Sequence, residues 1–424
     1  MKPKKGGDDR VIVRGILGLA VFAAIAVLLS ENRRRISIRT LMTGIGLQVA
    51  VGALVLKLPF FRQVFLALNR IILALQESTT AGTAFVFGYL GGGPLPFEAK
   101  FPNATFVLAF QALPLILVTS ALSALLFYWK ILPAVVRAFS WTLQKTMKIG
   151  GAEGLGVSAN IFVGMVESPL FIRPYLKDMT KSELFSLMTC GMATIAGTVM
   201  VLYSSLLAHV IPDAMGHILT ASIISAPAAV TVAKTMVPET GTLTVGTIRP
   251  PEEASSAMDA VTRGTIQGVQ LLMNIVAMLI VLVALVHLGN LVLGFLPDLK
   301  GEPVTLERLM GYVMAPVVWI MGIPWDEATT AGKLMGIKTI LNELLAYLNL
   351  GRLPDGALSP RSRIMLTYAM CGFANPGSLG IMIGGLGTMV PSRRDEIVSL
   401  GIRSILAGTL ATCMTGAVVG MLIR

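Results

Sequence analysis

The chain has 424 residues, of which 54% are hydrophobic and 13% are charged, and its mean hydropathy is +0.76. In soluble domains about 25% of the residues are charged, so this composition argues against a soluble enzyme. The net charge is +11, but the basic residues do not form one patch. The arginines and lysines lie in short clusters, such as Arg33–Arg35, between apolar stretches. Such clusters are typical of loops at a membrane surface. We therefore expect an integral membrane protein that contacts lipid and binds no nucleic acid polymer.

Long apolar segments predict an all-α protein with about eight transmembrane helices. In chain order they lie near residues 11–30, 41–56, 104–128, 184–209, 216–237, 264–296, 364–391 and 400–423. The first is followed by an arginine cluster and by no cleavage motif, so we expect a retained span. Residues 62–76 and 131–148 carry basic residues on an apolar background, which predicts amphipathic helices along the interface. Ends of tilted spans are the alternative interpretation of both stretches.

An internal repeat relates the two halves of the chain. The segment Cys190-Gly191-Met192-Ala193-Thr194 recurs, 181 residues later, as Cys371-Gly372-Phe373-Ala374-Asn375. A broken, semi-polar stretch with an acid precedes each copy, with Glu167 in the first and Glu343 in the second. Repeats of this kind in transporters place a binding site at their interface. We therefore expect the two acids to converge on one site.

Each repeat also contains a segment that is too short to cross the membrane and return. In residues 158–169, Gly164 and Pro169 lie on either side of Glu167, which predicts a re-entrant hairpin. A solvated turn outside the membrane is the alternative. The second such segment runs from Pro324 to Glu343, where the alternative is that Lys338 simply neutralises Glu343.

A span in the second repeat is predicted to be interrupted. Asn375-Pro376-Gly377-Ser378 lies within an apolar run, and proline and glycine there free backbone carbonyls beside Asn375 and Ser378. A kinked helix is the alternative. The first copy, from Thr194 to Gly197, contains no proline, so its interruption has less support. No phosphate-binding loop, H-E-x-x-H or G-x-S-x-G motif is present, so the sequence does not support an ATP-driven pump or these hydrolases.

Several motifs together carry a family resemblance. They are residues 82–88, 110–114, 159–164 with Glu167, 324–329, Lys338-Thr339 with Asn342-Glu343, and 371–375. With these motifs the chain resembles the concentrative nucleoside transporter family, bacterial branch, over nearly its whole length. The resemblance implies a multi-pass homotrimer of the inner (plasma) membrane that imports nucleosides as a sodium symporter.

The same resemblance implies how each protomer is divided. Eight spans, two opposed re-entrant hairpins and interfacial helices would form an inverted repeat, with a mobile transport domain on a trimerising scaffold. Residues 1–148 would supply scaffold spans and interfacial helices, 149–254 the first transport repeat, 255–320 a scaffold span and connection, and 321–424 the second transport repeat.

Functional residues follow from the resemblance position by position. The sodium ligands map onto Asn160, Val163, Thr194 and Ile195, the ribose contacts onto Glu343, Asn375 and Ser378, and the base-side contacts onto Met165, Val166 and Glu167, with Phe373 as an aromatic wall. Oxygen ligands suit a hard cation such as sodium. Related transporters usually have Gln followed by Thr or Ser where this chain has Met165 and Val166. The base specificity of the family therefore does not carry over.

Three alternatives remain open on the sequence. Protons could replace sodium, with Glu167 or Glu343 as the carrier. An integral-membrane enzyme is a second alternative. The embedded acids argue against it, because they occur once per repeat and without clustered Asp or His motifs. A membrane scaffold or sensor that transports nothing is the third, and no sequence feature favours it.

Overall fold

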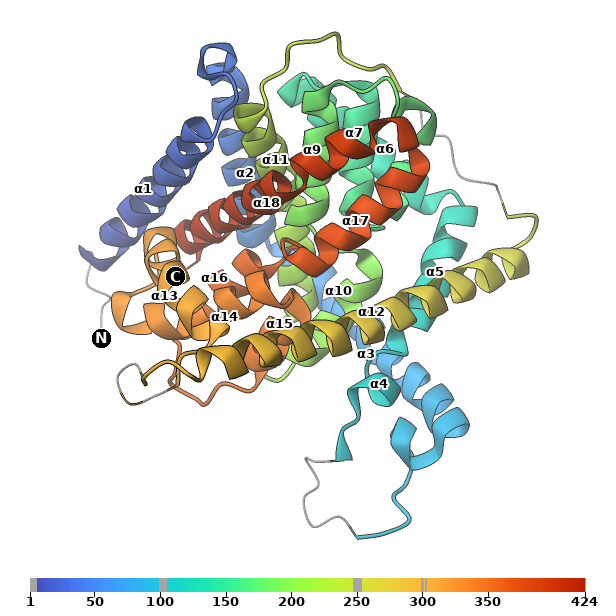
Figure 1. The fold of residues 1–424 in the computed structure, drawn as a ribbon. Coiled ribbons are helices and arrows are strands. Elements are labelled where there is room, and N and C mark those ends of the chain that lie inside the picture. The colour runs from blue at the N-terminus through green and yellow to red at the C-terminus, as the bar shows by residue number, and fades with distance from the viewer. Residues whose placement is uncertain (1–5, 99–104, 247–253, 299–300, 302, 424) are drawn as a thin grey trace.

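The structure is a computed structural model that describes residues 6–98, 105–246, 254–298, 301 and 303–423, and all regular elements in these residues are helical (Figure 1). The α-helices are α1 (Gly6–Leu28), α2 (Ile38–Lys57), α3 (Pro59–Phe87), α4 (Leu108–Gln111), α5 (Leu115–Tyr128), α6 (Ile131–Met147), α7 (Gly151–Asn160), α8 (Glu167–Leu170), α9 (Lys181–Ala193), α10 (Gly197–Leu207), α11 (Ala214–Met236), α12 (Ala257–Leu293), α13 (Leu306–Met321), α14 (Trp325–Ile340), α15 (Glu343–Gly351), α16 (Pro360–Met370), α17 (Pro376–Met389) and α18 (Arg394–Leu422). Short 3-10 turns are η1 (Arg33–Arg35), η2 (Gly88–Gly91), η4 (Arg173–Tyr175) and η5 (Pro391–Arg393).

The helices confirm the predicted all-α membrane class. Six stretches of the described chain are long and apolar enough to cross a membrane: Ile38–Lys57, Leu108–Tyr128, Lys181–Leu207, Ala214–Met236, Ala257–Leu293 and Pro391–Leu422. A shorter apolar stretch, Ile12–Leu28, lies in α1. The remaining predicted segment, 364–391, is divided between α16 and α17. Each of the eight predicted apolar segments is therefore mainly helical.

The two predicted interfacial stretches differ in outcome. Residues 131–147 form a separate helix, α6, as expected for 131–148. Residues 62–76 do not form a helix of their own, because they lie inside the 29-residue helix α3. Pro59 begins α3, and no glycine or proline follows until Gly82, so nothing in the sequence ends the helix earlier. Residues 62–76 are therefore part of a longer helix, and α3 is not among the described helices that are apolar enough to cross a membrane.

Both copies of the Cys-Gly repeat end in a break between two helices. Thr194 follows α9, and α10 begins at Gly197, although this copy lacks a proline. The backbone N–H of Gly197 donates to the carbonyl of Phe162 at 2.8 Å. A Cβ on residue 197 would lie 2.4 Å from that oxygen, so glycine is required for the approach. The hairpin backbone thus satisfies one donor that the broken helix frees.

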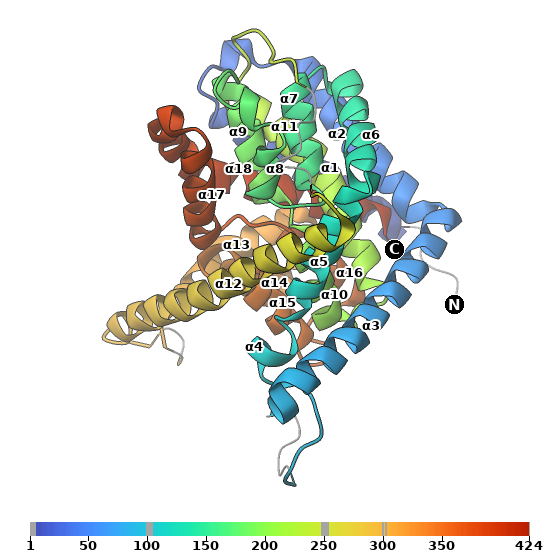
Figure 2. The same ribbon diagram turned by 90° about the vertical axis from the view of Figure 1, so that its right-hand side faces the viewer.

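Burial divides the helices into a central and a peripheral group. The stretches that contain α9 and α11 are almost entirely buried, whereas α12 exposes apolar side chains along its whole length. Figures 1 and 2 both show α12 as one long helix across the outside of the molecule, with α5 beside it. The end of α3 projects from the rest in both views. The hairpins α7–α8 and α14–α15 lie against the central helices α9 and α16 respectively.

Candidate functional site

A cavity of about 110 Å³ lies where the two hairpins meet the two helix breaks. All seven residues predicted to bind substrate line it, namely Met165, Val166, Glu167, Glu343, Phe373, Asn375 and Ser378. The opposite wall is apolar and comes from the peripheral helix α12, through Leu271, Ile275, Met278, Leu279 and Leu282. The cavity therefore lies between the central helices and α12, and both halves of the repeat contribute to it.

Glu343 organises the polar end of the cavity. It is the first residue of α15, where the positive end of the helix dipole favours a carboxylate. Its Oε1 accepts a hydrogen bond from the Tyr203 hydroxyl at 2.6 Å, and its Oε2 accepts one from Asn375 Nδ2 at 3.0 Å. Asn375 Oδ1 in turn accepts from the backbone N–H of Ser378 at 2.8 Å and caps α17. A carboxylate has about four lone-pair positions, so Glu343 can accept a further donor, such as a sugar hydroxyl.

Tyr203 is a cavity residue that the sequence analysis missed. It lies on α10 in the first repeat, 3% exposed, and reaches Glu343 in the second repeat. Its only sequence signal was a hydroxyl-bearing aromatic residue beside two serines in a mainly apolar span. The apolar wall from α12 was missed as well, because nothing in the sequence of a uniformly apolar helix indicates which face meets a site.

Met165 and Val166 give the other end of the cavity an apolar surface. A Cβ on Gly191 would lie 2.8 Å from the Met165 Cβ, and one on Gly385 would lie 3.0 Å from Val166, so both side chains pack tightly against glycines. Gly164, at the hairpin turn, has φ +115°, and a Cβ there would approach Glu167 to 2.8 Å. Glycine is therefore needed at residue 164 on both conformational and steric grounds.

The predicted sodium ligands lie beside this cavity, in the first hairpin and in the first helix break. The Thr194 hydroxyl donates to the Asn160 carbonyl at 3.3 Å and to the Cys190 carbonyl at 2.9 Å, which joins the hairpin to the first helix break. Asn160 is 1% exposed, and its Oδ1 has no hydrogen-bond partner among the described residues. Ile195 lies in the break, and Val163 lies in the hairpin turn. An orphaned, buried amide oxygen beside a helix break is what an oxygen-ligated cation requires.

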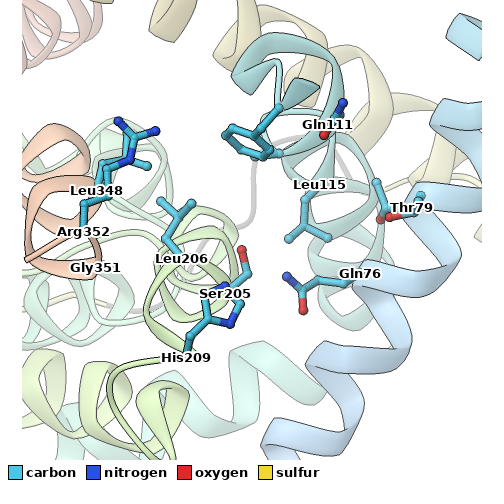
Figure 3. A pocket seen from close by; sticks show the side chains of 13 residues that line it. Gln76, Thr79, Gln111, Leu115, Ser205, Leu206, His209, Leu348, Gly351 and Arg352 are labelled. Carbon is cyan, nitrogen blue, oxygen red and sulfur yellow. The ribbon is translucent and has the colours of Figure 1, made fainter. Parts of the chain in front are cut away.

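A larger cavity of about 540 Å³ lies one helical turn further along α10 and α15. Figure 3 shows Leu348 and Arg352 on one side and Gln76, Thr79 and Gln111 on the other. Ser205 of α10 and His209, in the turn that follows α10, also line it, whereas none of the predicted site residues does. Tyr203 and Glu343 of the same two helices line the smaller cavity, so the two cavities lie along the same pair of helices, and no residue lines both.

Sequence profiles of known families cover most of the chain. Residues 17–90 match the profile described as "Na+ dependent nucleoside transporter N-terminus", residues 109–210 match "Nucleoside recognition", and residues 217–420 match "Na+ dependent nucleoside transporter C-terminus". The chain belongs to the concentrative nucleoside transporter family.

Individual relatives agree with this assignment. The chain is 39% identical to "Uncharacterized transporter YutK" of Bacillus subtilis, over 97% of this chain and 100% of that protein. It is 35% identical to "Nucleoside permease NupC" of Helicobacter pylori, over 96% of this chain and 97% of that protein. The solved structure "CNTnw in an inward-facing substrate-bound state" is 34% identical and has a TM-score of 0.87, covering 97% of this chain and 98% of that one. As a concentrative nucleoside transporter, the protein is a multi-pass protein of the plasma membrane.

Proposed function

We propose that this protein is a sodium-coupled symporter that imports nucleosides by alternating access and catalyses no chemical reaction. The observation that carries the proposal is that one hairpin turn contributes to both the candidate sodium site and the substrate cavity. Asn160 offers its orphaned oxygen at one end of the turn, and Met165 lines the cavity at the other. A sodium ion bound at Asn160 and Thr194 fixes the turn against the first helix break, which sets the position of the cavity wall. Ion binding and nucleoside binding are thereby linked.

The cavity dimensions support an occluding movement. Its volume of about 110 Å³ is below the roughly 300–1,000 Å³ of typical ligand sites, so a nucleoside requires the walls to separate. The α12 wall is the natural sliding surface, since it is apolar and offers the polar face of the cavity no hydrogen bond. Residues 149–254 and 321–424 form the mobile transport domain in this proposal, and residues 1–148 and 255–320 form the scaffold. In this proposal the larger cavity, further along α10 and α15, provides one aqueous approach to the site.

The proposed scaffold also supports a homotrimer. Helices α3 and α12 expose large apolar side chains, including Ile71, Leu73, Ile280 and Leu285. Apolar surface of this extent is covered by lipid or by other protomers. Assembly through these helices leaves the hairpins free to move.

Uptake into proteoliposomes tests the coupling ion. Purified protein is reconstituted and labelled uridine uptake is followed under an inward sodium gradient, an inward proton gradient, or neither. We expect concentrative uptake only with sodium, because the candidate ion site offers neutral oxygens and no carboxylate. Uptake that follows protons and ignores sodium would assign the coupling to Glu167 or Glu343 instead.

The altered base-side wall predicts broad base selectivity. Met165 and Val166 offer no hydrogen bond, so the base is held by shape and stacking, and the flexible methionine packs against different rings. We expect weak discrimination among bases and better tolerance of purines than in relatives with a polar pair. The double variant Met165→Gln/Val166→Thr should prefer uridine more strongly, because a polar site rejects ligands that leave it unpaired.

Competition uptake decides this prediction. Uridine, cytidine, adenosine and inosine compete with labelled uridine for wild type and double variant. Unchanged selectivity in the double variant would mean that water or Glu167 supplies the base contacts. A wild type that is already strictly pyrimidine-selective would contradict the account of this wall.

A further inference from the structure

Lys338, on the second hairpin, carries a fully buried ammonium group. Its exposed fraction is 0%, and its Nζ has no hydrogen-bond partner among the described residues. The carboxylate of Glu343 accepts hydrogen bonds from Tyr203 and Asn375 instead. Glu343 therefore does not neutralise Lys338 through a direct hydrogen bond, which was the alternative left open by the sequence. A charge without a direct partner is costly at membrane depth and marks a functional group.

Helix ends supply negative potential around this ammonium. Lys338 lies in the last turn of α14, and its electrostatic neighbours are Glu343, Cys413 and Cys371, of which Cys371 caps the C-terminal end of α16. The carbonyl ends of helices carry partial negative charge and favour cations. In transporters with interrupted helices, such ends coordinate the coupling ion.

The first repeat has the same construction around its candidate sodium site. There α7 ends at Asn160 and α9 ends at Ala193, and the thiol of Cys190 lies 3.6 Å from the carbonyl of Val157. Val157 precedes Lys338 by 181 residues, which is also the separation of Cys190 and Cys371. Val157 and Lys338 each lie in the last turn of the first helix of their hairpin.

The ion ligand is lost in the second repeat at the matching position. The last residue of α7 is Asn160, whereas the last residue of α14 is Ile340, which offers no side-chain oxygen. The second repeat thus has an apolar residue at the helix end where the first has an ion ligand, and it has a basic residue in the same helical turn.

We propose that the ammonium of Lys338 is a tethered cation. It supplies in the second repeat the positive charge that a sodium ion supplies in the first. The comparison with sodium rests on the proposed function. Lys338 is a positioning residue, because it acts on the substrate through Glu343: its charge attracts the carboxylate and so helps to hold it directed at the cavity. With this charge built in, the second repeat needs no mobile ion of its own.

Sodium-dependent binding tests the proposal in Lys338→Met, which keeps the length of the side chain and removes the charge. The uridine Kd is measured by calorimetry over a wide range of sodium concentrations, with Lys338→Gln as a second variant. Lys333→Met is the matched control, because Lys333 is exposed on the same helix. We expect the Kd at low sodium to rise at least about tenfold in both Lys338 variants and the sodium dependence to steepen by about one ion. The control should match the wild type.

Two results would contradict the proposal that Lys338 is a tethered cation. One is a wild-type Kd and sodium dependence in Lys338→Met, and the other is a loss of affinity that is equal at every sodium concentration, as a merely structural role predicts. A rescue experiment separates this inference from sodium coupling itself. In Lys338→Ala, n-propylammonium should restore uridine affinity and choline should not, whether or not the wild type uses sodium. Failure of n-propylammonium to restore affinity contradicts the proposal.

Discussion

Glu343→Gln is expected to weaken the binding of every nucleoside by about 10- to 150-fold, because hydrogen bonds to a charged group contribute about 1.5–3 kcal/mol each. The variant also disturbs the protein's own network. Both carboxylate oxygens accept bonds, from Tyr203 and from Asn375, so a glutamine amide must turn its NH₂ group toward one of these donors. The loss should be similar for purine and pyrimidine nucleosides, since the site acts on the sugar.

Asn375→Ala should have a comparable effect for a different reason. It removes the donor to Glu343 and the cap of α17 together, and loss of such a cap alone costs about 1 kcal/mol. Calorimetry with uridine and adenosine on protein of unchanged melting temperature measures both variants. Glu77→Gln is the control, because Glu77 is exposed on α3 and away from the cavity. Unchanged affinity in a folded Glu343→Gln protein would remove this residue from the site.

Asn160→Ala is expected to raise the sodium concentration for half-maximal uridine binding by about 5- to 150-fold. The variant deletes Asn160 Oδ1, a buried oxygen at the hairpin end that has no partner in the described chain, and loss of such a ligand costs about 1–3 kcal/mol. Affinity for uridine at saturating sodium should change little, because Asn160 does not line the substrate cavity.

The measurement is a titration of uridine binding with sodium in a choline background. Asn349→Ala, an exposed asparagine on α15, serves as the control. An equal loss of uridine affinity at low and at saturating sodium would show that Asn160 shapes the hairpin and does not bind the ion.

The internal repeat is the part of the sequence that predicts most of the site. A membrane-embedded acid or proline is too costly to occur without a reason, so the sequence alone indicates Glu343 and Asn375 as candidates. Both line the cavity, and they contact each other. The first break is harder to predict, because it depends on Gly197 approaching the carbonyl of Phe162, a tertiary contact that no local pattern reveals.

Other features could not be predicted for the same physical reason. The length of α3 and the cavity wall of α12 depend on what surrounds a helix, and an apolar periodicity does not distinguish lipid, a neighbouring helix and a ligand. Tyr203 was missed because its hydroxyl is satisfied across the repeat by Glu343, 140 residues away. The five-residue spacing of Lys338 from Glu343 suggests a direct pair, whereas the helix geometry leaves the ammonium without that hydrogen bond.

Coupled flux is the most direct test of sodium-driven nucleoside transport by this protein. Labelled sodium and labelled uridine are followed together in proteoliposomes with an interior-negative potential. At about 100 mV, one charge per uridine supplies about 2.3 kcal/mol and supports accumulation of roughly fiftyfold. We predict that the two labels enter in a fixed ratio and that uridine accumulates toward this value. Uridine entry that only equilibrates, or that proceeds without sodium entry, would contradict the account.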